Sequence, residues 1–140
     1  MAEDGLPQRI KTDHHAAMYE AFAYPPGVVA SGRIAFISGQ VGFEDDGSVS
    51  EDPETQINRA FANLGKVLEA VPATPRQVVD LTTLHRGMEV TLPLVSAAKA
   101  AFFGEGDGGW EPAWTVIGVS ELALPALVFE VRAVVCCGPE

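Results

Sequence analysis

The chain has 140 residues, of which 47% are hydrophobic, so it can bury one core, and a second domain is not expected. Nine lysines and arginines against nineteen aspartates and glutamates give a formal charge of −10, which makes nucleic acid an unexpected partner. The sequence has no apolar stretch of about 20 residues and no signal-peptide pattern at its start, so we expect a cytoplasmic protein without a membrane partner.

The first 27 residues mix charged residues, an adjacent His14–His15 pair and a Tyr24–Gly27 turn signal. This mixture predicts an N-terminal arm or irregular strand in front of the main domain, which we place at residues 28–140. The paired histidines and the distant His85 lack the spacing and the ligand support of a zinc site, so no metal is expected. We interpret the pair as solvated and His85 as a structural or rim residue.

Two short strands are predicted next, Val28–Ala30 and Ile34–Ser38, joined in a hairpin by the Ser31–Gly32 turn signal. The second strand is apolar enough to lie in the centre of a sheet. Gly39 closes this strand, and a glycine at such a place indicates that the backbone comes close to another group.

Two helices and an intervening strand follow. Asp52 and then Pro53 predict a helix start, since aspartate caps helix N-termini and proline is favoured in the first turn. The helix face is formed by apolar residues at helical spacing, namely Ile57, Ala60, Phe61, Leu64 and Leu68. Val78–His85 has the β-branched content of a strand, and Thr91–Phe103, with its first residue as the cap, predicts a helix that ends at Gly104.

The last third of the chain predicts a loop and two strands. Gly104–Gly109 matches the glycine pattern of nucleotide-binding loops, but it follows a helix instead of a strand, so we interpret it as a plain loop. Trp114–Val119 and Leu127–Val135 are the predicted strands, which gives the order β-β-α-β-α-β-β. Cys136 and Cys137 are adjacent and cannot link distant segments, which indicates a reducing compartment.

Glu130 stands in the middle of the apolar last strand, where an unpaired carboxylate is costly to ionise. One interpretation is a structural ion pair with Arg132, two residues on and on the same face. The other is a general acid or base at a cleft. Ser38 and Thr115 have no recognisable histidine and acid partners, so a hydrolase triad is not supported.

Several segments together resemble the Rid (YjgF-like) family over nearly the whole domain. They are residues 28–40 with the ending Ile37-Ser38-Gly39-Gln40, the helix 56–69, the strand 78–83, Pro112-Ala113-Trp114-Thr115 and Glu130-Val131-Arg132-Ala133. The resemblance implies an α+β, chorismate-mutase-like fold with a mixed sheet and two helices on one face. It also implies a homotrimer with clefts between subunits, and hydrolysis of reactive imines and enamines to 2-keto acids and ammonia without a cofactor.

The same resemblance assigns roles to individual residues. Ser38 and Gly39 match the strand-end backbone contact of the family, and Thr115 matches a small hydroxyl residue beside the substrate anchor. Glu130 matches the carboxylate that positions water, and Tyr24 aligns approximately with the pocket tyrosine. We therefore expect Glu130 to be the catalytic residue and the other four to bind substrate.

Two positions depart from the imine-deaminase branch of that family. Trp114 stands where that branch has an arginine that binds the substrate carboxylate, and Ser96 stands where an asparagine is common. Since an indole has one donor and a large apolar face, we expect a neutral or aromatic ligand instead of a standard 2-imino acid. The leading hypothesis is an enzyme for an imine, enamine or related intermediate, and the alternative is a non-catalytic ligand-binding trimer. An endoribonuclease is disfavoured by the charge of −10.

Overall fold

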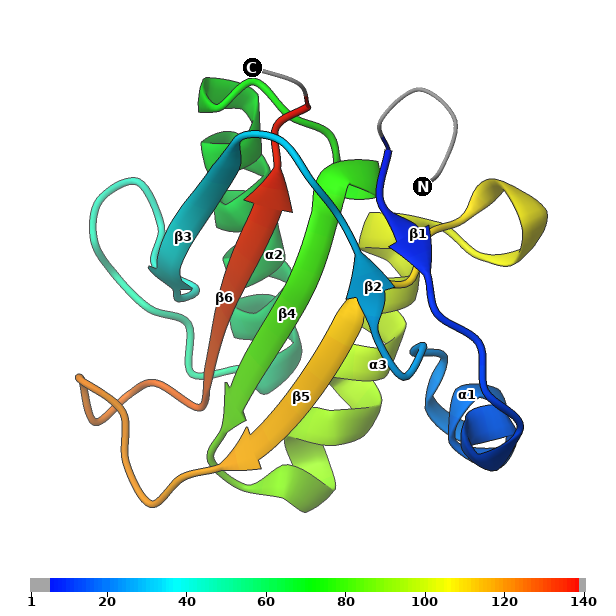
Figure 1. Ribbon diagram of the computed structural model, residues 1–140. Helices are drawn as coiled ribbons and strands as arrows, with labels where there is room; N and C mark the ends of the chain where they lie inside the picture. Colours follow the sequence, from blue (N-terminus) through cyan, green and yellow to red (C-terminus); the bar gives the residue numbers. More distant parts are fainter. Residues whose placement is uncertain (1–5, 139–140) are drawn as a thin grey trace.

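The structure is a computed structural model that describes residues 6–138, apart from the side chain of Asp107. Its centre is a four-stranded sheet in the order β3-β6-β4-β5 (Figure 1). The strands are β3 (Ile34–Gln40), β4 (Val78–His85), β5 (Ala113–Gly118) and β6 (Phe129–Cys136). β6 pairs antiparallel with β3 and β4, whereas β4 and β5 are parallel, so the sheet is mixed as expected.

Two long helices, α2 (Pro53–Ala70) and α3 (Met88–Phe103), lie on the same face of this sheet (Figure 1). α2 begins where the sequence predicts, because the Asp52 carboxylate accepts the backbone N–H of Thr55 at 3.0 Å. α3 crosses from β4 to β5 and so supplies the long connection that two parallel strands require. The expected α+β architecture is therefore confirmed.

α3 starts earlier than predicted, and the predicted cap is wrong. Its N-cap is Gly87, whose φ of 79° lies in the left-handed region that favours glycine. Thr91 lies one turn further on, where its hydroxyl donates to the Gly87 carbonyl at 3.2 Å and meets Nδ1 of His85 at 2.8 Å. This threonine satisfies a buried histidine instead of the first N–H groups of the helix.

The N-terminal arm contains β1 (Gln8–Arg9) and α1 (Ala16–Phe22), and β1 pairs antiparallel with β2 (Val28–Val29), which follows the arm. The helix α1 was not predicted, since none of its residues is buried and it therefore shows no apolar stripe. It ends at Ala23, which has a left-handed φ of 55°.

The predicted hairpin between the strands at 28–30 and 34–38 is wrong. β2 pairs with β1, and β3 pairs with β6. The backbone of Arg33, which would have to continue a hairpin, is instead bonded to the C-terminal segment: its N–H donates to Gly138 at 2.9 Å, and its carbonyl accepts from Cys137 at 2.7 Å. The Ser31–Gly32 turn therefore leads the chain from one sheet to the other. Cys136 and Cys137 are both free thiols.

The two faces of the central sheet differ. The core lies between the sheet and α2 and α3, and includes Leu81, Val131 and Val135. The opposite face, here called the open face, is not covered by a helix within the described residues (Figure 1). It exposes 76% of Phe36 and 41% of Ile34. No helix in residues 6–138 is long and apolar enough to cross a membrane.

Candidate active site

Glu130 lies against the end of β3. The pairing of β3 with β6 is irregular between Ile37 and Gln40, so Ser38 and Gly39 depart from the regular ladder. A Cβ placed on Gly39 would lie 2.5 Å from Cδ of Glu130, so only glycine leaves room for this carboxylate. The close approach expected at Gly39 is thus made by Glu130. These residues, Ser38, Gly39 and Glu130, are called the Glu130 group below.

The ion pair between Glu130 and Arg132 does not form among the described residues. Both side chains belong to the open face, but Arg132 is exposed and lies across from Thr82, whereas Glu130 lies across from Leu84. The structural ion-pair interpretation of Glu130 is therefore wrong. Within residues 6–138 no cationic side chain forms an ion pair with the half-buried carboxylate.

Three other predicted residues, Tyr24, Trp114 and Thr115, line a cavity of about 410 Å³, here called the Trp114 cavity. The rings of Tyr24 and Trp114 meet edge to face, with centroids 6.0 Å apart and an interplanar angle of 89°. The remaining lining is apolar and comes from Met18, Phe22, Leu92 and Val116. The structure thus brings these three residues together around one hollow at the edge strand β5.

Trp114 does not offer its N–H to this cavity. The side chain is 7% exposed, and it belongs to the core between sheet and helices. Its Nε1 donates to Oγ1 of Thr83, 2.9 Å away, in the interior. The expectation that the indole gives a ligand one donor is wrong, because this donor is already used inside the core. What the indole can offer is apolar surface.

Lys99 is a member of this region that sequence reasoning missed. Its Nζ lies 4.4 Å from the centroid of the Trp114 ring and donates to the Ala23 carbonyl at 2.6 Å. Burial lowers the pKa of Lys99 to about 8, although the charge of Glu111 opposes the shift. The available signal was spacing, since Lys99 comes four residues after the buried Val95 on α3.

Ser96 lies outside the Trp114 cavity. It lines a neighbouring hollow of about 290 Å³ together with Lys99, Glu111 and the end of α1. Phe22 lines both hollows. The structure therefore does not place Ser96 beside the other predicted binding residues.

Within one chain the Glu130 group and the Trp114 cavity lie apart. Thr115 and Glu130 both face the open side, but β4 lies between their strands. Two strand spacings correspond to about 10 Å, too far for both residues to touch one small reacting group. In residues 6–138, apart from the side chain of Asp107, no group of His, Cys, Asp or Glu side chains is placed to hold a metal ion.

A family model described as Endoribonuclease L-PSP matches residues 14–137. The chain belongs to the Rid (YjgF-like) family. Family members generally have imine deaminase activity, so membership supports a small-molecule, deaminase-like or related role.

Individual Rid proteins agree with this assignment. RutC family protein YjgH of Escherichia coli (strain K12) is 32% identical over 106 residues, which are 76% of this chain and 77% of YjgH. The crystal structure of the Rid family protein YyfB from Yersinia pestis has a TM-score of 0.82 at 31% identity and covers 93% of this chain and 98% of YyfB. A structure of YjgH has a TM-score of 0.68 at 28% identity, with 95% and 97% of the two chains covered.

Proposed function

We propose that this Rid protein hydrolyses a small imine, enamine or related carbonyl-derived intermediate, with Glu130 as its general acid and base. The observation that carries the proposal is the Glu130 carboxylate, held against Gly39 at a strand end without an ion pair to Arg132. In imine hydrolysis, water adds to the C=N carbon and nitrogen leaves as ammonia. A carboxylate can take a proton from the attacking water and return it to the departing nitrogen.

The substrate of this reaction is neutral or aromatic in the proposal. The position of the family's anchoring arginine holds Trp114, whose N–H is engaged with Thr83. Among the residues that the structure describes, no guanidinium therefore lines the Trp114 cavity to bind a carboxylate in bidentate fashion. Lys99 is the cation beside the indole, but it is 5% exposed and donates to Ala23. An apolar or aromatic body fits the Met18, Phe22 and Leu92 side of the cavity.

The complete site forms between copies of the chain in a homotrimer. A neighbouring copy would bring its Trp114 cavity to the Glu130 group, which one chain alone keeps about 10 Å apart. The exposed Phe36 and Ile34 on the open face support such contact, because large apolar side chains gathered on one surface favour association. Light scattering on a sizing column tests this part, and a monomer at micromolar concentration contradicts it.

The reaction is tested by ammonia release from two imines generated in situ: 2-iminobutanoate, made by an amino-acid dehydratase, and the neutral imine that an amine oxidase makes from a primary arylalkylamine. We expect acceleration for the neutral aromatic imine and little for 2-iminobutanoate. Glu130→Gln should reduce turnover on the order of 10²- to 10⁴-fold, since it removes the titrating group and keeps the size. Glu69→Gln, an exposed carboxylate on α2, is the matched control.

The alternative is a trimer that binds a ligand without chemistry. The favouring observation is that the Trp114 cavity is mostly apolar, as in a binding pocket. This alternative holds if the wild-type chain binds the arylalkylamine or its carbonyl product but accelerates the hydrolysis of neither imine. An endoribonuclease role, which the family description names, is opposed by the formal charge of −10, and we expect no RNA cleavage.

A further inference from the structure

Two arginines meet on one indole at the base of the N-terminal arm. Cζ of Arg76 lies 3.9 Å from the centroid of the Trp110 ring, and Cζ of Arg9 lies 5.8 Å from it. The ring is fixed, because Trp110 is 4% exposed and its Nε1 donates to the Val78 carbonyl at 2.7 Å. Two guanidinium groups are thereby held near each other on a rigid support, although like charges repel.

These side chains line a cavity of about 320 Å³, here called the Trp110 cavity, together with Pro7, Gln8, Lys11 and Gly109. Three of the nine basic residues of a chain with a charge of −10 gather here. The cavity shares no lining residue with the Trp114 cavity.

The local charge is only partly balanced. Arg9 forms an ion pair with Glu111, which also accepts from the Tyr19 hydroxyl at 2.9 Å. Arg76 has no carboxylate partner among the described residues: its Nη2 donates to the Pro7 carbonyl at 3.0 Å, and its Nη1 is buried without a hydrogen-bond partner. Burial and the charge of Arg9 lower the pKa of Arg76, which means that the folded structure destabilises its charged form.

We propose that the Trp110 cavity binds the oxyanion of a small molecule, either a carboxylate or a phosphate, through Arg76, Arg9 and Lys11. Both oxyanions match the donor geometry of guanidinium, and either would supply the negative charge that Arg76 lacks among the described residues. A bound anion would also offset the repulsion between the two arginines. This site is separate from the proposed hydrolytic reaction and does not depend on it.

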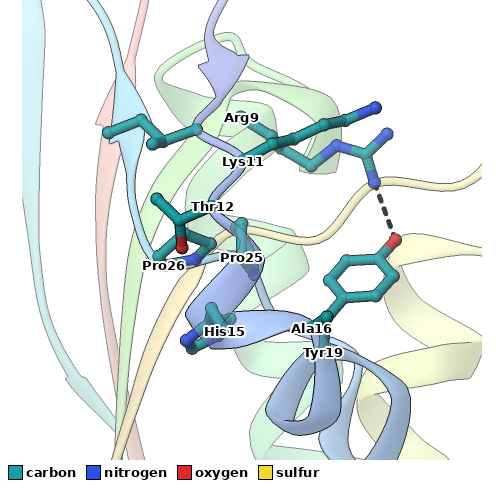
Figure 2. A pocket seen from close by; sticks show the side chains of 9 residues that line it. Arg9, Lys11, Thr12, His15, Ala16, Tyr19, Pro25 and Pro26 are labelled. Carbon is teal, nitrogen blue, oxygen red and sulfur yellow. Dashed lines mark hydrogen bonds between the residues drawn. The ribbon is translucent and has the colours of Figure 1, made fainter.

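A second hollow indicates where the rest of the ligand lies. It has about 280 Å³, shares Arg9 and Lys11 with the Trp110 cavity, and adds apolar surface from Ile10, Pro25 and Pro26. Figure 2 shows the Arg9 and Lys11 side chains extending in the same direction, with Arg9 bonded to the Tyr19 hydroxyl. An oxyanion attached to an aromatic or apolar body therefore fits better than a bare inorganic ion.

Calorimetric titration of the full chain with phenyl phosphate and with benzoate tests the site. We expect saturable binding of at least one probe, and the tighter of the two identifies phosphate or carboxylate as the preferred group. Arg76→Met should weaken this binding by about tenfold or more, since it removes charge-assisted hydrogen bonds. Arg33→Met, at an exposed arginine outside the cavity, should leave it unchanged.

Lys11→Glu keeps the test decisive if Arg76→Met does not fold. Lys11 is exposed and has no ion pair in the described residues, so reversing its charge should not unfold the protein. The reversal should still weaken binding of the anionic probe several-fold. Binding of neither probe up to tens of millimolar overturns the proposal. Binding that is equal in the wild type, Arg76→Met and Lys11→Glu also overturns it, because the anion would then be held elsewhere.

Discussion

Trp114 donates its indole N–H to Thr83 at 2.9 Å, and the same Thr83 oxygen lies 2.8 Å from Nε2 of His85. Thr91 uses its single hydroxyl proton on the Gly87 carbonyl, so it can only accept from Nδ1–H of His85. Nε2 of the neutral His85 is then bare and accepts from the Thr83 hydroxyl, which in turn accepts from Trp114. An oriented chain of hydrogen bonds thus ties the Trp114 side of the candidate site to the start of α3.

Thr83→Val should destabilise the fold, because it keeps the shape of residue 83 and removes its hydroxyl. The buried Nε1 of Trp114 and Nε2 of His85 would both lose their partner. An unsatisfied buried group costs about 1–3 kcal/mol, so we expect a loss of about 2 kcal/mol or more in the free energy of unfolding measured in urea.

Thr82→Val is the matched control, since Thr82 lies on the same strand but faces the open side. It should change the free energy of unfolding by less than about 0.5 kcal/mol. Equal effects of the two substitutions would show that the hydrogen bonds from Trp114 through Thr83 to His85 add no stability of their own.

Acid should weaken the fold through His85. Burial lowers the pKa of His85 from 6.5 to about 4, so the unfolded chain takes up its proton before the folded protein does. Stability is then lost as the pH falls from 6.5 to 4, by up to about 3 kcal/mol from this residue. Urea unfolding of the wild type and His85→Gln across this range measures the effect. A slope with pH that the two proteins share would remove His85 as its cause.

Alkali should act in the opposite direction through Lys99. Its pKa of about 8 in the folded protein lies below the ordinary 10.5, so between these values the unfolded chain binds more protons. The free energy of unfolding of the wild type, relative to Lys99→Met, should therefore rise from pH 8 toward pH 10. The rise is on the order of 3 kcal/mol at most. A flat difference between the two proteins would mean that Lys99 is not held in a desolvating site.

Periodic sequence signals predicted the elements that pack against the core. The Asp52–Pro53 start of α2, the strand Val78–His85 and the alternation in β6 were all correct, because in each case burial of one face dictates the spacing of apolar residues. Elements without a buried face escaped this reasoning. α1 has no buried residue, and β1 has only a two-residue ladder with β2.

Parts of the candidate site depended on three-dimensional pairings that no local pattern shows. The contact of Glu130 with Gly39 depends on the irregular ladder between β3 and β6. The pairing of the Trp114 N–H with Thr83 depends on parallel strands joined through a helix. Family resemblance identified these positions, but it could not tell that the indole donor is already engaged.

Gly39→Ala separates the position of the Glu130 carboxylate from its chemistry. The new Cβ would lie 2.5 Å from Cδ of Glu130, so the carboxylate must move to another position. Its chemical identity as an acid or base is unchanged. Gly39 is exposed and its φ is not in the left-handed region, so alanine itself is not strained there and the fold should survive. If Glu130 is the proposed general acid and base, imine hydrolysis should fall by at least tenfold, since small misplacements of reacting groups are costly.

The control for this substitution is Gly65→Ala on α2, where an added Cβ would meet Phe102 at an ordinary 3.6 Å. Replacing glycine by alanine inside a helix should raise the free energy of unfolding by about 0.5–1 kcal/mol and leave turnover unchanged. Ammonia release and urea unfolding are measured on both variants. Full activity in Gly39→Ala, together with a normal unfolding curve, would show that the carboxylate need not lie where β3 ends. In that case Glu130 would not be the group that positions water.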